Sequence, residues 1–332
     1  MRRLLILLCS LSVLAGCSRS NKEPGAAGGS PEESSPAVQT SVNMPVGSPI
    51  PKFSGAEAFS FLSAQTAFGP RNPGSMGHGA CLQYLSSALS PLADTLWLQK
   101  FHHDGYDGQS LSLTNVVASF NVKAATRILL CAHWDTRPRA ENDPDKSRRN
   151  EPILGANDGA SGVAVLLELG RLLKSTPPSV GVDIVLFDGE DYGKEGDHQS
   201  YFLGARYFAS AKQASYNPRF GILLDMVGDK FLDLPKEQYS VQYAPDVVDL
   251  VWNAAASLGI GQFHDEPGEE VLDDHIPLNE AGVKTIDIID FNYPDPTNRF
   301  WHSHQDIPAN CSAESLEAVG TVITKVVYSQ LP

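Results

Sequence analysis

The stretch RILLCAH, from Arg127 to His133, decides the fold class of this chain. It is a continuous apolar run, which is typical of a strand that is buried on both faces of a sheet. Residues 182–188 (VDIVLFD) have the same character, and residues 160–173 between them carry apolar side chains at helical spacing. Buried strands that alternate with helices predict an α/β fold of three α/β/α layers, with a central mixed, mostly parallel, twisted sheet.

Other segments extend this pattern in both directions along the chain. Further strands are expected at residues 113–120, 220–227 and 285–289, and further helices at residues 56–68, 76–92, 201–211 and 314–328. Residues 137–152 are charged and contain proline, so we expect a loop there.

Histidine or carboxylate follows four of the expected strands. In open α/β sheets, functional sites form beyond the carboxyl ends of the strands. We therefore expect one rim of the sheet to gather the polar residues that follow these strands, which are His133, Asp135, Asp188, Glu190, Asp191, Asp225 and His302.

Asp158 is a further candidate, and it and some of the residues at the strand ends also have ordinary structural explanations. Asp158 precedes a helix and could be its N-cap, and Glu190 with Asp191 could form a solvated turn. Beside a metal, one of two adjacent carboxylates can bind the ion while the other accepts and donates protons. A catalytic zinc site uses three protein ligands, and His with two carboxylates satisfies that requirement. This donor set disfavours copper(I) and leaves manganese, cobalt and iron open.

The start of the chain predicts export. A basic MRR precedes the apolar run LLILLCSLSVLAG, which has the composition of a signal peptide and is shorter than the roughly 20 residues of a membrane span. The LAGC ending resembles a bacterial lipobox, so residues 1–17 are predicted to be a lipoprotein signal peptide with the lipid on Cys17. An ordinary signal peptide is the alternative. The residue after this cysteine is Ser18 and not an aspartate. In Gram-negative lipoproteins this favours the outer membrane, so the chain is predicted to be anchored there, facing the periplasm.

Composition divides the remainder of the chain. Residues 18–51 are rich in Ser, Pro, Gly, Ala and Glu and are predicted to be a disordered tether, whereas residues 52–332 have the size of one catalytic domain. The formal charge of -14 argues against a nucleic-acid partner and against a polybasic membrane patch, so membrane attachment is expected only through the lipid. Cys81, Cys131 and Cys311 are an odd number, so at most one internal disulfide is expected.

Seven short motifs occur in a fixed order: GPRNPGS, CAHWD, GANDGASG, FDGED, LLDMVGD, LDDHIP and FWHS. Together they resemble the zinc aminopeptidase and glutaminyl cyclase superfamily, from about residue 53 to the C-terminus. The resemblance implies that Asp158, Asp191 and His302 bind zinc and that Glu190 is the general acid and base. In two-metal aminopeptidases, two further ligands correspond to His133 and Asp225.

Two features favour the glutaminyl cyclase branch. Asp273 opens the DDHIP motif, where aminopeptidases usually have serine, and Trp301 precedes the metal histidine as in the cyclases. The cyclase aspartates that match Asp225 and Asp273 hydrogen-bond to each other, and this bond would compete with a second metal, so we expect one zinc. Animal cyclases also carry a tryptophan after the paired carboxylates. This chain lacks it, and Tyr192 and Phe202 are the candidates for that pocket wall.

The resemblance predicts a glutaminyl-peptide cyclotransferase, an acyltransferase that converts N-terminal glutamine of peptides or proteins to pyroglutamate and releases ammonia. Glu190 would move a proton from the α-amino group to the leaving ammonia. Asp225 and Asp273 would hold the tetrahedral intermediate, and Trp301 would roof the pocket. The alternative is a two-metal aminopeptidase that hydrolyses N-terminal residues. A noncatalytic binding protein on the same fold is less favoured, because the chain keeps every expected ligand.

Overall fold

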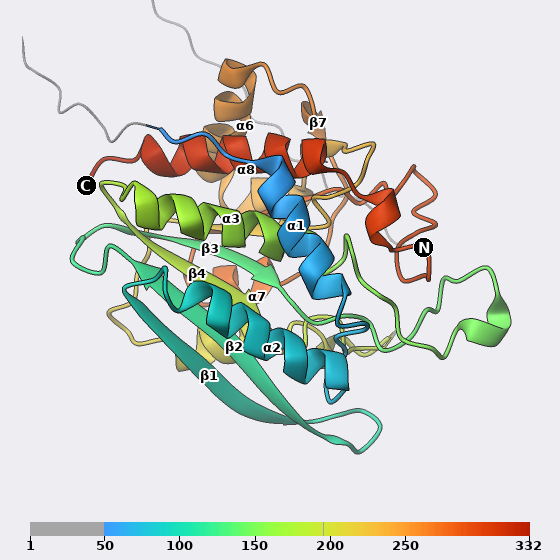
Figure 1. The fold of residues 1–332 in the computed structure, drawn as a ribbon. Helices are drawn as coiled ribbons and strands as arrows, with labels where there is room; N and C mark the ends of the chain where they lie inside the picture. The colour runs from blue at the N-terminus through green and yellow to red at the C-terminus, as the bar shows by residue number, and fades with distance from the viewer. Residues whose placement is uncertain (1–49, 195) are drawn as a thin grey trace, which may run out of the picture. The chain divides into compact units, whose positions relative to one another are not determined.

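The central sheet has six strands in the computed structural model, which describes residues 50–194 and 196–332 (Figure 1). The strand order is β1-β2-β4-β3-β5-β8. The pairs β3–β4, β3–β5 and β5–β8 are parallel, while β1–β2 and β2–β4 are antiparallel. The strands are β1 (Thr95–Asp104), β2 (Ser110–Phe120), β3 (Arg127–His133), β4 (Gly181–Phe187), β5 (Gly221–Asp225) and β8 (Thr285–Ile289).

Helices cover both faces of this sheet, because successive side chains of the buried strands point in opposite directions. Ile128, Leu130 and Ala132 of β3 belong to a core that includes α1 (Gly55–Thr66), α2 (Met76–Leu89), α3 (Ser161–Ser175) and α8 (Ala313–Tyr328). Leu129 and Cys131 belong to a second core with α4 (Leu203–Ala211) and α7 (His275–Glu280). Figure 1 shows α1, α3 and α8 in front of the sheet and α7 behind it. The three-layer α/β/α prediction is therefore confirmed.

Smaller elements fill the region between β5 and β8. They are the short parallel pair β6 (Leu234–Lys236) and β7 (Phe263–Pro267), with α5 (Gln238–Tyr243) and α6 (Pro245–Leu258). In the part of the chain that the structure describes, three 3₁₀ turns lie in loops, at Lys146–Arg148, His198–Ser200 and Pro308–Asn310. Within the described residues, no helix is both long enough and apolar enough to cross a membrane.

The expected strands and helices are present with small shifts at their ends. The expected strand at residues 220–227 is shorter, because β5 ends at Asp225 and Met226 has a left-handed φ of 49°. Cys81, Cys131 and Cys311 are all buried free thiols, so none of the three is in a disulfide. The predicted signal peptide, the lipid site Cys17 and nearly all of the predicted tether lie outside the described residues.

The parallel strands bring the predicted polar residues to one rim. His133 is the last residue of β3 and Asp225 is the last residue of β5. Residues 188–191 follow β4, and the segment that carries His302 follows β8. Residues at or after the carboxyl ends of these four strands therefore contribute to one site, as is usual in α/β sheets.

Candidate functional site

The first group of potential metal ligands is Asp158, Asp191 and His302. One ligand atom from each lies within 4.8 Å of the others, and all three residues are buried. The imidazole Nε2 of His302 is 3.3 Å from Asp191 Oδ1 and 3.6 Å from Asp158 Oδ2. Residues that are far apart in the chain thus converge as the zinc hypothesis requires.

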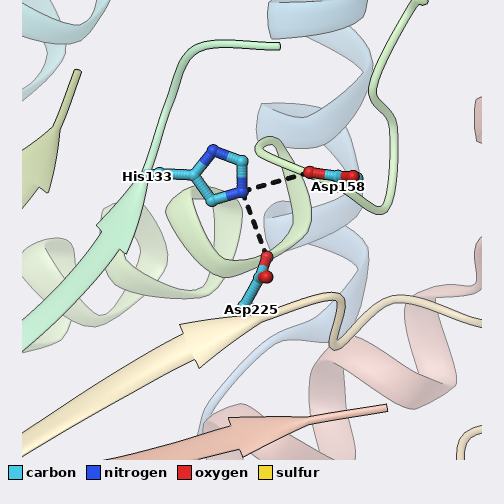
Figure 2. A group of neighbouring side chains, drawn as sticks. All are labelled: His133, Asp158 and Asp225. Atoms are coloured by element: carbon cyan, nitrogen blue, oxygen red, sulfur yellow. Dashed lines mark hydrogen bonds and ion pairs between the residues drawn. The ribbon is translucent and has the colours of Figure 1, made fainter. Parts of the chain in front are cut away.

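The second group is His133, Asp158 and Asp225, and it shares Asp158 with the first (Figure 2). His133 Nε2 lies 3.2 Å from Asp158 Oδ1 and 3.2 Å from Asp225 Oδ1. Asp158 therefore turns one oxygen toward His133 and the other toward His302. The structure brings together every residue that was expected to bind a first or a second metal.

The Asp158 carboxylate does not cap the helix that follows it. The N-cap of α3 is Ala160, which makes no side-chain capping bond, so the ordinary explanation of Asp158 is not the one observed. Its backbone N–H instead donates to Asp306 Oδ2 at 3.1 Å, and the N–H of Asn157 donates to Asp306 Oδ1 at 2.7 Å. Gly159 has a φ of +95°, and a Cβ there would lie 2.3 Å from the Asp135 carbonyl oxygen, so this turn requires glycine.

A second buried aspartate holds the loop after β4. Asp135 accepts the backbone N–H of Glu190 at 3.0 Å and that of Asp191 at 3.2 Å. These bonds leave the two neighbouring side chains free to point differently. Asp191 turns toward His302, whereas Glu190 Oε2 lies 3.9 Å from His133 Nδ1. The adjacent carboxylates are therefore not a simple solvated turn.

The ionisation of the paired carboxyls differs. Burial raises the pKa of Glu190 well above its ordinary value, and the carboxylates of Asp191 and Asp273 raise it further, against the opposing effect of His133. Burial also opposes ionisation of Asp191, but His302 and Arg137 outweigh it and lower the pKa of Asp191 to about 2. Together with the positions of the two side chains, these pKa directions favour Asp191 as an anionic ligand and Glu190 as a proton carrier.

A pocket of about 550 Å³ opens onto the first metal group. Glu190, Asp225, Asp273 and Trp301 line it together with the three ligands. The Trp301 ring stacks on the His302 imidazole with centroids 3.7 Å apart. The expected acid–base group, the two further aspartates and the expected roof therefore face one cavity.

Tyr192 and Phe202 were the two candidates for the pocket wall, and they differ in position. Phe202 lines the pocket, as does Tyr201 beside it. Tyr192 is buried elsewhere, because its hydroxyl donates to Asp107 Oδ1 at 2.7 Å and its ring packs against Tyr106. Phe202 has a φ of 59°, which is a strained value for a residue with a side chain and is often found at functional sites.

Asp225 departs from the hydrogen bonding that we expected. Within the described residues, its carboxylate is 3.2 Å from His133 Nε2, and it makes no hydrogen bond to Asp273. Asp273 lies in a buried carboxyl cluster with Asp225, Asp274 and Asp287. Burial raises the pKa of Asp273, Asp274 and Asp287 well above ordinary values. Repulsion from Asp225 adds to this effect at Asp273, and repulsion from Asp273 adds to it at the other two. Asp273 can therefore carry a proton, although it makes no hydrogen bond to Asp225.

The first group fits a zinc ion. It supplies one imidazole nitrogen and two carboxylates, which are typical ligands of a catalytic zinc site. Asp191 Oδ2 is buried and has no hydrogen-bond partner among the described residues, so a donor atom is left over in the site. A buried polar atom without a partner is costly in a folded protein, and a metal would satisfy it.

Sequence reasoning missed two residues that organise this site. Asp306 holds the backbone of Asp158, and it follows the FWHS motif by only a few positions. Arg137 donates to Asp191 and lies in the segment that was expected only as a charged loop. Each contact joins residues that are more than 50 positions apart, and nothing local in the sequence marks it.

Comparisons with known proteins agree with this geometry. A solved glutaminyl cyclase of Bacteroides thetaiotaomicron, bound to N-acetylhistamine, is 41% identical and superposes with a TM-score of 0.81, covering 85% of this chain and 100% of that one. A structure described as a leucine aminopeptidase precursor from the same organism is also 41% identical, with a TM-score of 0.81 over 85% of this chain and 99% of that one.

A more distant relative is aminopeptidase YwaD of Bacillus subtilis, which is 28% identical over 216 residues. The match covers 63% of this chain and 42% of that protein. The model of peptidase family M28 matches residues 115–327, which contain every ligand described above. The chain belongs to peptidase family M28.

Proposed function

We propose that this chain is a zinc-dependent glutaminyl-peptide cyclotransferase, which converts N-terminal glutamine of peptides and proteins to pyroglutamate. One observation carries the proposal: the chain matches a solved bacterial glutaminyl cyclase over that protein's whole length at 41% identity. The pocket supports it, because Glu190 and Trp301 line the same cavity as Asp158, Asp191 and His302.

The chemistry needs a proton carrier at the reacting nitrogen. Zinc held by Asp158, Asp191 and His302 would polarise the side-chain amide carbonyl of the substrate glutamine. Glu190 accepts a proton from the α-amino nitrogen as that nitrogen bonds to the amide carbon. Glu190 then donates this proton to the departing nitrogen, and ammonia leaves as the carbon–nitrogen bond of the amide breaks.

The other lining residues hold the substrate during this transfer. Trp301 offers an aromatic face beside His302, and Phe202 also lines the cavity. Asp225 and Asp273 both face the cavity and would hydrogen-bond the tetrahedral intermediate. The first of these carboxylates is fixed by His133, whereas the second can donate a proton because its pKa is raised by burial.

The second candidate function is hydrolysis by a two-metal aminopeptidase. It is favoured by the second group, in which His133, Asp158 and Asp225 have ligand atoms within 4.8 Å of one another. The likeness to the structure described as a leucine aminopeptidase precursor points the same way. We prefer the cyclase because Trp301 and Asp273 are both in the pocket, where the cyclase motifs require them.

Two substrates separate these functions. The purified domain is incubated with a glutamine-amide and a leucine-amide peptide, each with and without a chelator. The proposal expects cyclisation of the glutamine substrate alone, with ammonia release that stops on chelation and returns with zinc. Release of free leucine would instead establish the aminopeptidase.

We also propose that the chain is exported and anchored in the outer membrane through a lipid on Cys17, facing the periplasm. This proposal rests on the signal-like start and the LAGC ending of the apolar run. The test is to express the full chain and its Cys17→Ser variant in a bacterium and to compare the amount of each in the membrane fraction. The variant should be lost from that fraction, and an unchanged distribution would contradict lipid attachment.

A further inference from the structure

Arg137 is a buried arginine that joins a proposed metal ligand to the pocket wall. Only 1% of its side chain is exposed. Its Nη1 donates to Asp191 Oδ1 and to the Asp191 carbonyl oxygen, both at 3.0 Å. Its Nη2 donates to the Tyr201 hydroxyl at 2.9 Å, and its Cζ lies 5.1 Å from the centre of the Tyr201 ring.

These contacts leave the two oxygens of Asp191 in different situations. Oδ1 accepts a hydrogen bond from Arg137, whereas Oδ2 is buried and has no partner among the described residues. The bond to the carbonyl oxygen also fixes the backbone of the same residue. Arg137 therefore restricts both the rotation of this carboxylate and its position, and it leaves one oxygen available.

The positive charge of Arg137 is balanced within the same network. Glu141 accepts hydrogen bonds from Arg137 Nε at 3.0 Å and from Nη2. An unbalanced guanidinium beside a divalent cation would repel it, since like charges interact strongly in buried sites. Glu141 offsets that charge, and the hydrogen bonds of Arg137 remain to orient Asp191.

We propose that Arg137 is a positioning residue that orients Asp191 to bind the metal through Oδ2. The inference rests on the proposed zinc site. Groups that hydrogen-bond a metal ligand typically contribute about 10- to 100-fold to metal affinity. We therefore expect a loss of that size when the guanidinium is removed.

Zinc affinity of the metal-free protein, measured by competition with a chromophoric chelator, tests this role without any activity assay. Arg137→Met should weaken zinc binding by about 10- to 100-fold. Arg137→Lys keeps the charge but cannot donate to Asp191, Glu141 and Tyr201 in the same way, so it should recover only part of the affinity.

Arg139→Met is the matched control. Arg139 lies in the same loop, donates to the Tyr106 hydroxyl and to the Gly193 carbonyl oxygen, and contacts no proposed ligand. Its removal should leave zinc affinity within about twofold of the wild type. Circular dichroism of each metal-free variant shows whether it is folded, and if Arg137→Met is not, Arg137→Lys carries the comparison.

The outcomes separate this inference from the proposed function. Unchanged or tighter zinc binding by a folded Arg137 variant, beside a wild type that binds zinc, would overturn the positioning role alone. An equal loss in Arg139→Met would also overturn it, because the effect would then belong to the loop. A wild-type protein that binds no zinc would contradict the proposed function itself.

Discussion

The two ligand groups share Asp158 but differ in what surrounds them. In the first group, Asp191 and His302 both line the pocket, and Asp191 Oδ2 lacks a partner. In the second group, His133 is 1% exposed and its Nε2 is within 3.2 Å of both aspartates. The first group lines the pocket and has a free carboxylate oxygen, whereas in the second group His133 Nε2 has carboxylate partners and the buried His133 Nδ1 has no hydrogen-bond partner among the described residues. We therefore expect the metal in the first group, with His133 supporting Asp158.

The largest expected effect separates the two histidines. His302→Ala should lose both measurable zinc binding and cyclase activity, because it removes one of three ligands. His133→Ala should keep zinc with an affinity about 10- to 100-fold weaker, as for a residue that supports a ligand. Metal analysis and activity of both variants test the comparison.

Equal loss of zinc in both histidine variants would show that the groups act as one two-metal centre. Thermal unfolding supplies an independent readout, because a ligand that binds only the folded protein raises its stability. Added zinc should therefore raise the melting temperature of His133→Ala and leave that of His302→Ala unchanged.

A smaller loss is expected at the proton carrier. Glu190→Gln should lower cyclase turnover by about 10²- to 10⁴-fold, the usual contribution of general acid–base catalysis, while zinc content stays the same. Glu270→Gln is the control, since Glu270 also lines the pocket but is exposed and is assigned no proton. Full activity in Glu190→Gln would refute the assigned role.

The smallest of these effects is expected at the pocket wall. Phe202→Ala should raise KM about tenfold with little change in kcat, because lost apolar pocket contacts cost about 1–3 kcal/mol. Tyr192→Phe removes a hydroxyl that bonds Asp107 and should leave KM unchanged. If the Tyr192 variant changed KM and the Phe202 variant did not, the wall would be assigned wrongly.

Much of the fold could be predicted because the buried strands are continuous apolar runs. β3 and β8 have the predicted bounds, and the strand-end rule placed His133, Asp225 and Asp191 at one rim. The edge strand β1 escaped prediction, because only Gln99 and Phe101 within it are buried and its apolar run, residues 96–98, is short. The helix α6 carried helically spaced valines that could have revealed it.

The contacts that tune the site could not be predicted, because they depend on tertiary neighbours. Arg137 meets Asp191 and Tyr201 across separations of 54 and 64 residues. The choice between Phe202 and Tyr192 was also beyond the sequence, since both follow the paired carboxylates and only the path of the loop decides which ring faces the pocket.

The metal content of the purified chain tests the central claim most directly. After dialysis against buffer without free metal, elemental analysis by mass spectrometry should find one zinc per chain. His302→Ala should contain none under the same conditions. Two tightly held ions per wild-type chain would contradict the one-zinc account and favour the aminopeptidase, and an active protein without metal would contradict both.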